Sequence, residues 1–430
     1  MSSVNTGPTG FQAVREANLG VVLRAVRSLA PCSRAAIAAA TGLNKTTVSS
    51  LVADLISRGL VRETGESTQR RVGRPGVLLA LDDSTIAAIG LEVNVDYLSV
   101  VAVDLVEQEL LTRHISFDAR AAGPEACAHR IARATAEAMA DPALAGRGVI
   151  GVSVAVPALI DAPSGTVTRA PNLGWRDTPL RDRLTHLMAE ARLPTAPILV
   201  DNDANLGAVA EFRSGHLTRT PDLVYITGEV GIGAGVLTDG NLLRGSTGFA
   251  GEIGHIPLME DGPECGCGRR GCLEAIAGIE PILRAAVPDR VPEGPLSGDG
   301  IAHLVDVAVE RAEAGDATAL DTLHTAGTWL GRGIATLVDI VNPAAVVLGG
   351  YFVPMAPWLL PNCRAAVREI AIAPDAGGCR VEPSTLGLSA AARGGAMAMI
   401  DALDSGRLPL PPARSAAPAA TSGPGPNAPA

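Results

Sequence analysis

One histidine and three cysteines stand close enough together in the sequence to hold a metal ion. His255 is followed by Cys265, Cys267 and Cys272 in a segment rich in glycine. Three thiolates and one imidazole complete the tetrahedral shell that Zn²⁺ takes in structural sites, with no position left open for catalysis. The alternative is a set of buried thiols beside an unrelated histidine, but a glycine-rich loop makes a poor hydrophobic core. The spacing therefore predicts a structural zinc site.

The amino-terminal segment carries a second kind of chemistry, the binding of an anionic partner. In residues 1–80 ten basic residues stand against four acidic ones, whereas the whole chain has a net charge of −10. A basic segment on an acidic body indicates an anionic partner for that segment alone. Three short helical patterns follow one another there, and the third begins after Asn44 with an apolar stripe from Val48 to Ile56. Its other face carries short polar donors and one lysine, as a DNA recognition helix requires.

An arginine-rich tip between two predicted strands follows this third helix. The second of these strands is Val77–Leu81, and the pattern predicts a winged helix-turn-helix over residues 17–82. Its third helix would enter the major groove, and the arginines would touch phosphates or the minor groove. A small helical dimerisation module with a solvated polar face is the alternative. The residues expected to contact DNA are Ser33, Asn44, Lys45, Thr46, Thr47, Ser49, Ser50, Arg70, Arg71 and Arg74.

From residue 86 onward the chain alternates short β-branched runs with helical patterns. Runs such as 149–156 and 223–227 are bounded by turn residues, and 319–341 is one of the helical patterns. This alternation predicts an α/β body with mixed or parallel sheets. Residues 1–16 and the Pro/Ala/Ser/Gly-rich residues 405–430 are expected to be disordered. The apolar runs fall short of the ~20 residues of a membrane span and no secretory pattern is present, so we expect a cytoplasmic protein.

Four segments of the body resemble the ROK family, whose name stands for repressors, open reading frames and kinases. In chain order they are residues 170–175, 202–205, 228–235 and 251–255, the last followed by the cysteines. The resemblance covers roughly residues 86–400, and the joint occurrence in this order makes it specific. It implies an actin-like, ribonuclease-H-like sugar-kinase fold over residues 86–404, with lobes of about 86–200 and 201–404, and it also implies zinc at the cysteine loop. With the amino-terminal module, the chain resembles the repressor branch of the family.

The resemblance further implies a carbohydrate site, which needs donors and acceptors held around the sugar hydroxyls. Glu252 and His255 share one face of a helical turn, so His255 can hold zinc through one ring nitrogen and face a hydroxyl with the other. In the related kinases the Asp of the Asn-Asp-Ala-Asn segment is the base for the attacking hydroxyl, and Asp203 matches it. Capping or turn roles are the alternative for each residue. The residues carried over to the sugar site are Asn172, Asn202, Asp203, Glu252, His255 and Glu274.

The phosphate-binding part of the family pattern is broken in this chain. Kinases of this fold begin the body with Asp-x-Gly-Gly-Thr, whose glycines let the backbone approach the phosphates of ATP. Here residues 92–96 read Glu-Val-Asn-Val-Asp, and the second glycine loop carries Glu229 and Val230. Side chains block the backbone approach, and carboxylates repel phosphate unless a metal intervenes. Because phosphoryl transfer depends on positioning and charge stabilisation, we expect no catalysis, with Asp203 a vestigial base.

These patterns together predict a DNA-binding transcriptional regulator, a repressor of genes for carbohydrate uptake or metabolism. Its partners would be double-stranded operator DNA and a sugar or sugar phosphate that acts as effector. A homodimer or homotetramer would present two winged modules to paired half-sites. Two alternatives stay open: an active ATP-dependent ROK sugar kinase that carries a DNA-binding module, and a dimerising scaffold that responds to another signal, such as a partner protein.

Overall fold

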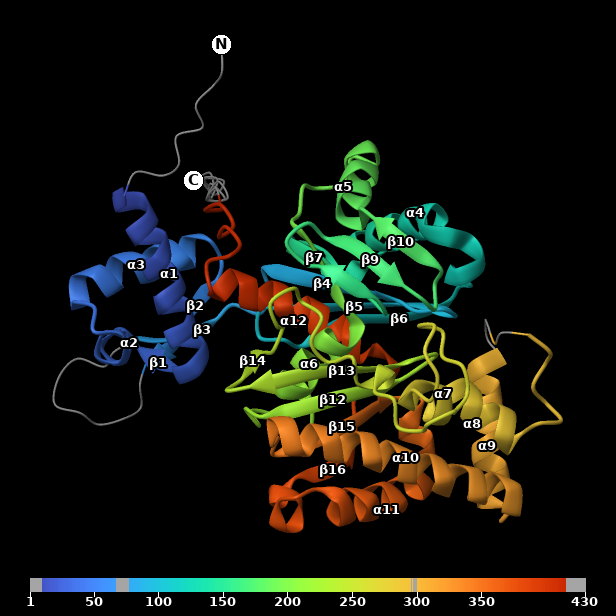
Figure 1. The fold of residues 1–430 in the computed structure, drawn as a ribbon. Coiled ribbons are helices and arrows are strands. Elements are labelled where there is room, and N and C mark those ends of the chain that lie inside the picture. Colours follow the sequence, from blue (N-terminus) through green and yellow to red (C-terminus); the bar gives the residue numbers. More distant parts are fainter. Residues whose placement is uncertain (1–9, 67–76, 295, 297–299, 415–430) are drawn as a thin grey trace, which may run out of the picture. The chain divides into compact units, whose positions relative to one another are not determined.

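The computed structural model describes residues 10–66, 77–294, 296 and 300–414, and the chain divides into two compact units (Figure 1). Unit 1 consists of residues 1–86 and 402–430, and unit 2 of residues 87–401. Unit 1 is therefore built from both ends of the chain. Arg70, Arg71 and Arg74 of the expected wing tip lie outside the described residues.

Unit 1 contains the three expected helices and a small antiparallel sheet. The helices are α1 (Gly10–Leu29), α2 (Arg34–Thr41) and α3 (Lys45–Ser57), and the strands β1 (Cys32–Ser33), β2 (Val61–Glu66) and β3 (Val77–Leu81) pair in the order β1-β3-β2. The apolar stripe of α3 is buried, as at Val48 and Leu55. Ser33 caps α2 by accepting a hydrogen bond from the Ala36 backbone N at 3.2 Å, and Asn44 caps α3 by accepting one from Thr47 N at 2.8 Å.

The carboxyl-terminal segment completes unit 1. Within this unit Arg27 Nε donates to Asp404 Oδ2 at 2.6 Å, and Arg414 N donates to the carbonyl oxygen of Ser57 at 2.8 Å. Arg58 also donates from Nη1 to the carbonyl oxygen of Pro411 at 2.8 Å. The disorder expected for residues 1–16 and 405–430 is tested only where the structure describes the chain: residues 10–16 belong to α1, and residues 405–414 contact the three-helix domain. The composition of residues 405–414 did not predict this, because their hydrogen bonds are made to Ser57 and Arg58, which are far away in the sequence.

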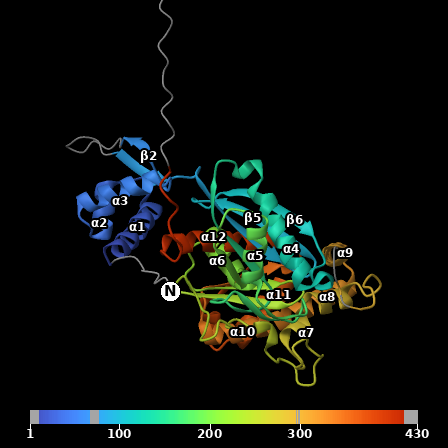
Figure 2. The ribbon, with the colours of Figure 1, turned by 90° about the horizontal axis from the view of Figure 1, so that it is seen from above.

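The first lobe of unit 2 is a five-stranded sheet with helices on both faces. Its strand order is β11-β7-β4-β5-β6, and α4 and α5 lie together on one face (Figure 2). A small antiparallel sheet of β8, β9 and β10 follows β7 along the chain. The bounds are β4 (Ile86–Val93), β5 (Tyr97–Asp104), β6 (Glu109–Ser116), α4 (Ala119–Met139), β7 (Gly148–Val156), β8 (Leu159–Asp161), β9 (Thr166–Ala170), β10 (Trp175–Thr178), α5 (Leu180–Glu190) and β11 (Ile198–Asn202).

The second lobe is a mixed sheet with strand order β14-β13-β12-β15-β16, in which β12 pairs parallel with β15 and antiparallel with β13. The long helices α10 and α11 pack against each other beside this sheet. The bounds are β12 (Leu223–Gly228), β13 (Ile232–Thr238), β14 (Asn241–Leu242), α7 (Leu273–Ala277), α8 (Ile279–Ala286), α9 (Gly300–Glu313), α10 (Ala317–Val341), β15 (Ala345–Gly350), α11 (Phe352–Ile370), β16 (Arg380–Pro383) and α12 (Ala390–Asp404). The mixed α/β body expected from the sequence is confirmed.

Helix α6 (Asp203–Ser214) joins the two lobes, because it packs against β7 and β11 of the first sheet and β12 and β13 of the second. Glycine makes this close approach possible: a Cβ at Gly235 would collide with the carbonyl oxygen of Ala204. A Cβ at Gly394 of α12 would likewise collide with the carbonyl oxygen of Leu206. This tight packing fixes the amino-terminal end of α6, where Asp203 stands.

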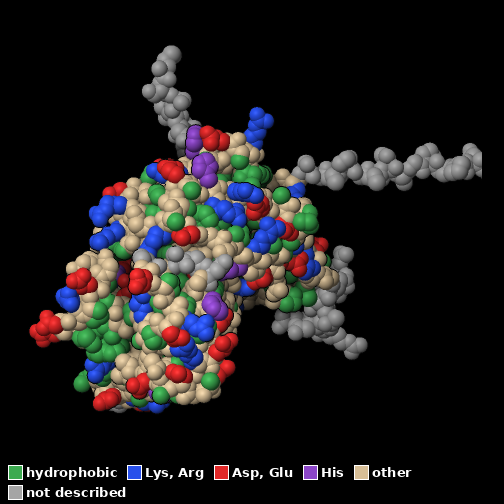
Figure 3. All heavy atoms as spheres, turned by 90° about the vertical axis from the view of Figure 1, so that its right-hand side faces the viewer, with side chains coloured by type: hydrophobic (Ala, Val, Ile, Leu, Met, Phe, Trp, Pro, Cys, Tyr) green, Lys and Arg blue, Asp and Glu red, His purple; other side chains and the backbone are tan. Residues whose placement is uncertain are grey.

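The described surface carries mixed charge. On the face shown in Figure 3, basic and acidic side chains are interspersed with apolar ones. Many charges on the body are ion-paired, as in the pairs of Arg213 with Glu107 and of Arg364 with Glu382. Among the described residues no helix is both long enough and apolar enough to cross a membrane.

Candidate functional site

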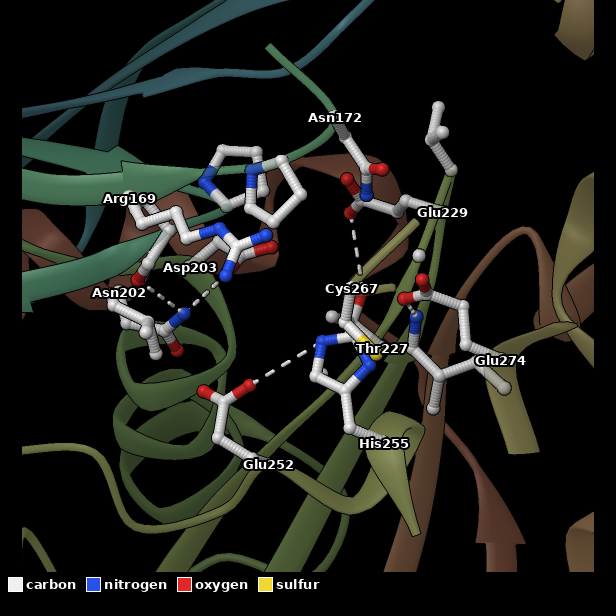
Figure 4. Close-up of a pocket in the computed structure, with 18 of the residues that line it drawn as sticks. Arg169, Asn172, Asn202, Asp203, Thr227, Glu229, Glu252, His255, Cys267 and Glu274 are labelled. Carbon is white, nitrogen blue, oxygen red and sulfur yellow. Dashed lines mark hydrogen bonds and ion pairs between the residues drawn. The ribbon is translucent and has the colours of Figure 1, made fainter. Parts of the chain in front are cut away.

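A cavity of about 400 Å³ in unit 2 is lined by residues from both lobes (Figure 4). Its wall combines the turn after β4, the loops that follow β7 and β9, the start of α6, the β12–β13 loop and the cysteine loop. Every residue that the sequence analysis assigned to a carbohydrate site lies in this wall: Asn172, Asn202, Asp203, Glu252, His255 and Glu274.

Asn202 and Asp203 stand where β11 ends and α6 begins. Asn202 caps the helix, because its Oδ1 accepts a hydrogen bond from Asn205 N at 3.0 Å. The same side chain donates from Nδ2 to Asp203 Oδ1 at 2.9 Å and to the carbonyl oxygen of Ala158 at 3.3 Å. Asp203 is buried, and this burial raises the pKa of its carboxyl group to about 6. A capping role and a place in the pocket are thus compatible for this pair.

Two further carboxyl groups enter the cavity from the second lobe. Glu252 precedes the single helical turn η2 (Ile253–His255), and 43% of its side chain is exposed. Partial desolvation, followed by the nearby carboxylates of Asp203 and Glu274, raises the pKa of Glu252 to about 7. Glu274 on α7 is fixed by its Oε2, which accepts a hydrogen bond from Ile232 N at 3.0 Å. The second lobe therefore supplies one partly exposed and one anchored acceptor.

The four predicted metal ligands gather at one end of the pocket. The ligand atoms of His255, Cys265, Cys267 and Cys272 all lie within 4.8 Å of one another. His255 Nδ1 is 3.6 Å from Cys265 Sγ, and the other ring nitrogen, Nε2, is 3.9 Å from Glu252 Oε2. The sequence predicted that one ring nitrogen of His255 faces the metal and the other faces the cavity. These distances are consistent with that prediction. A set of three sulfurs and one nitrogen fits zinc, because soft thiolates and imidazole select it over Mg²⁺ or Ca²⁺.

The side of the pocket that corresponds to the phosphate loops of kinases is filled by buried carboxyl groups. Glu92 is 1% exposed and accepts a hydrogen bond from Tyr97 Oη at 2.8 Å. Burial raises the pKa of Glu92 to about 8, and burial together with the neighbouring carboxyl groups holds that of Glu229 well above its ordinary value. With a pKa of about 8, Glu92 is mainly protonated at neutral pH. Both steric blocking and charge repulsion are expected here from the sequence. Asn94 and Val95 line the cavity, as the steric part of that expectation requires, while the raised pKa of Glu92 weakens the repulsion.

Arg169 also lines the pocket, and the sequence analysis did not single it out. It lies on β9 opposite Leu159 of β8, and both side chains reach the cavity. Its place three residues before Asn172, on the strand that leads into the family's Asn-Leu-Gly-Trp segment, was the only available signal. The other polar residues of the wall are Asn94, Thr227, Glu229, Cys267 and Arg269.

The predicted DNA-contacting residues of α3 lie as a recognition helix requires. Lys45, Thr46, Ser49 and Ser50 are exposed, on the side opposite the buried stripe, while Thr47 is half-buried. The side-chain oxygens of Ser33 and Asn44 are already used as helix caps. The exposed face of α3 therefore presents polar side chains and one lysine to solvent.

Comparison with known proteins identifies the architecture. The model of the ROK family matches residues 88–402, and that of the MarR family matches residues 21–72. The chain belongs to the ROK family. It is 30% identical over 388 residues to the xylose repressor of Bacillus subtilis, covering 90% of this chain and 96% of the repressor.

Solved structures agree with this assignment of the ROK chain. A ROK family transcriptional regulator, a homologue of the Escherichia coli MLC protein, superposes with a TM-score of 0.74 at 24% identity, over 91% of this chain and 97% of that one. A ROK family glucokinase from Streptomyces griseus, solved with glucose and AMPPNP, gives a TM-score of 0.60 at 29% identity, over 73% of this chain and 98% of the kinase. The expected winged helix-turn-helix followed by a two-lobed ROK body is confirmed.

Proposed function

We propose that this ROK protein is a DNA-binding transcriptional repressor of genes for sugar uptake or metabolism, with a carbohydrate as its effector. The observation that carries the proposal is the joint presence of a winged helix domain and a pocket that holds all six expected sugar-binding residues. The similarity to a xylose repressor over nine-tenths of the chain supports the same function. A genome-wide pull-down of bound DNA tests it, since bound sites beside sugar transport or catabolic genes are expected.

Operator contact is assigned to α3 and the wing. Lys45, Thr46, Ser49 and Ser50 would read bases and nearby phosphates, and Arg70, Arg71 and Arg74 would contact phosphates or the minor groove. Replacing Arg71 with Ala should weaken binding to all DNA sequences and lower the slope of log K against log salt by about 1. An unchanged slope in electrophoretic mobility shift titrations would contradict the wing assignment.

The ligand set His255, Cys265, Cys267 and Cys272 is proposed to hold a structural Zn²⁺. When bound, zinc would tie the cysteine loop together and fix the imidazole ring that faces Glu252. Because all four positions of the shell are taken by protein ligands, the metal would have no open position for a reaction.

The pocket is proposed to bind its sugar without phosphorylating it. Asp203 keeps the position of a base, which favours the alternative of an active kinase, but the phosphate side is occupied by Glu92, Asn94, Val95 and Glu229. Loss of the groups that position and stabilise the transferred phosphoryl group would remove several kcal/mol of transition-state stabilisation. A coupled ADP-release assay with several hexoses and amino sugars should show no turnover. Turnover that Asp203→Ala abolishes would establish the kinase instead.

Communication between sugar and DNA requires two states with different affinities for the sugar. A homodimer or homotetramer with two winged modules would bind paired half-sites, and sugar binding between the lobes would change the spacing of those modules. Titration of the effector against an operator-bound sample should then shift the DNA affinity, and reciprocally DNA should shift the sugar affinity by the same factor.

A further inference from the structure

Arg169 lines the pocket, and its guanidinium group has no direct ion-pair partner among the described residues. In the part of the chain that the structure describes, its side chain forms neither a hydrogen bond nor an ion pair, and no carboxylate oxygen lies within 4.0 Å. Other arginines of unit 2 are ion-paired, as Arg244 is with Asp201 at 2.5 Å. An arginine that lines a cavity without a partner is available to a ligand.

The pairing of the strands places Arg169 at one defined end of the pocket. Arg169 lies opposite Leu159, and the preceding carbonyl, that of Ala158, accepts the hydrogen bond from Asn202 Nδ2 at 3.3 Å. Figure 4 shows the Arg169 side chain extending from its strand into the cavity on the side of Asn202 and Asp203. Arg176, directly opposite on β10, is exposed and is not part of the pocket wall.

Ligand binding would change the surroundings of this group. Arg169 is half-buried, and a sugar that fills the cavity removes more of the water around it. A neutral hydroxyl can accept a single hydrogen bond from it, whereas a phosphate or carboxylate accepts two parallel, charge-assisted hydrogen bonds from the planar guanidinium, which are about twice as strong. A cationic amino sugar would meet repulsion at the same point.

The carboxyl groups of the pocket do not oppose an anion as strongly as their number suggests. Glu274 has one oxygen committed to Ile232 N, and Glu229 is buried with its Oε1 accepting from Thr227 Oγ1 at 3.2 Å. Asp203 accepts a hydrogen bond from Asn202, and its pKa is already raised to about 6, so a nearby anion can bring it to the protonated form.

We infer that the effector is an anionic carbohydrate, a sugar phosphate or a sugar acid, whose charged group is bound by Arg169 at the Asn202–Asp203 end of the pocket. The inference rests on the proposed sugar-binding function and narrows it to one chemical class. Arg169 is thereby the residue that distinguishes charged from neutral sugars.

The test is isothermal titration calorimetry on the full-length, zinc-containing protein with matched ligands. Glucose and N-acetylglucosamine serve as neutral probes, their 6-phosphates as phosphate probes, and gluconate and glucuronate as carboxylate probes. At least one anionic member should bind tenfold or more tightly than its neutral parent. Arg169→Leu should abolish that preference, Arg169→Lys should retain part of it, and Arg176→Leu should leave it unchanged. Circular dichroism and zinc content establish that each variant is folded.

The outcomes separate this inference from the function on which it rests. Preferred binding of a neutral parent, or a preference for the anion that survives Arg169→Leu, overturns the inference and leaves the sugar-responsive regulator in place. Absence of binding by every probe, neutral and anionic, counts against both. Tight binding by the phosphates alone or the carboxylates alone identifies which charged group the site accepts and supports the inference.

Discussion

Glutamate side chains line both sides of the pocket, but their exposure to solvent and their hydrogen bonds differ between the two sides. On the sugar side, Glu252 is partly exposed beside His255, and Glu274 is oriented by a backbone N–H. On the side that would hold phosphate in a kinase, Glu92 is buried and hydrogen-bonded to Tyr97, and Glu229 of the pocket wall is mostly buried and hydrogen-bonded to Thr227. A carboxyl group that keeps contact with solvent can serve as an acceptor for a ligand, whereas one without it becomes protonated and acts as packing. Residue type alone does not reveal which of the two roles a glutamate has.

The largest effect should come from removing the metal site, which supports only the sugar side. Cys272 is fully buried, and Cys272→Ser should remove a thiolate from the proposed zinc site, where a bound zinc would contribute on the order of 10 kcal/mol to folding of its loop. We expect zinc content to fall toward zero and effector affinity to fall by more than ~100-fold, or about 3 kcal/mol. Mass spectrometry for zinc and calorimetry measure the two quantities.

Cys379→Ser is the matched control, because Cys379 is half-buried and lies apart from the ligand set. Zinc content and effector affinity should remain those of the unaltered protein. A Cys272→Ser variant that still binds sugar at full strength would show that the sugar side does not depend on the loop.

A paired substitution compares the two sides directly. Glu252→Gln should weaken effector binding by roughly 10- to 100-fold, because a charge-assisted hydrogen bond contributes about 1.5–3 kcal/mol. Glu229→Gln should change the affinity by less than about twofold, since Glu229 is buried and its Oε1 already accepts a hydrogen bond from Thr227. Calorimetry with the same ligand decides the comparison, and equal losses in the two variants would erase the distinction between the sides.

The buried carboxyl group of Glu92 should make the free energy of unfolding depend on pH. Because the pKa of Glu92 is about 8 in the folded protein and near 4.5 when unfolded, the folded state holds a proton that the unfolded state releases between these values. Stability from this group is complete below pH ~4.5 and is lost as the pH rises toward 8. Between pH 6 and 8.5 we expect a loss of about 2.5 kcal/mol that is smaller in Glu92→Gln, measured by urea unfolding of the full chain. An equal loss of stability in the two proteins over this pH range would contradict the idea that Glu92 holds a proton in the folded state.

The smallest effect concerns one hydrogen bond on the buried side. Tyr351 Oη donates to Asp96 Oδ2 at 3.1 Å. Tyr351→Phe should lower the free energy of unfolding by about 0.5–1.5 kcal/mol and leave effector affinity unchanged. Thermal denaturation and calorimetry provide the two readings, and a loss of sugar affinity here would mean that the sides are coupled.

Features set by local sequence could be predicted. The polar face of α3 follows from its helical period, and the metal site follows from the spacing of Cys265, Cys267 and Cys272. The sugar-side residues required the family pattern, because Asn172 and Glu252 are far apart in the chain and only the fold brings them to one cavity.

Features set by tertiary surroundings could not be predicted. Arg169 belongs to the pocket because of the pairing of β8 with β9, which no local pattern specifies. The protonation of Glu92 depends on its burial, which the sequence does not show. Its residue type alone therefore suggested a charged group that repels phosphate. Residues 405–414 are rich in proline and small residues, and their order comes from bonds to Ser57 and Arg58.

The construction of unit 1 from both chain ends has a consequence for how the protein is made. During synthesis the ribosome releases α1–α3 first, but Asp404 and Pro411, which bind Arg27 and Arg58, emerge only after the whole of unit 2. An incomplete chain therefore lacks the carboxyl-terminal residues that stabilise its winged helix domain. We expect nascent or prematurely terminated chains to bind operators poorly, so that a promoter is occupied by complete molecules that also contain the sugar-binding unit.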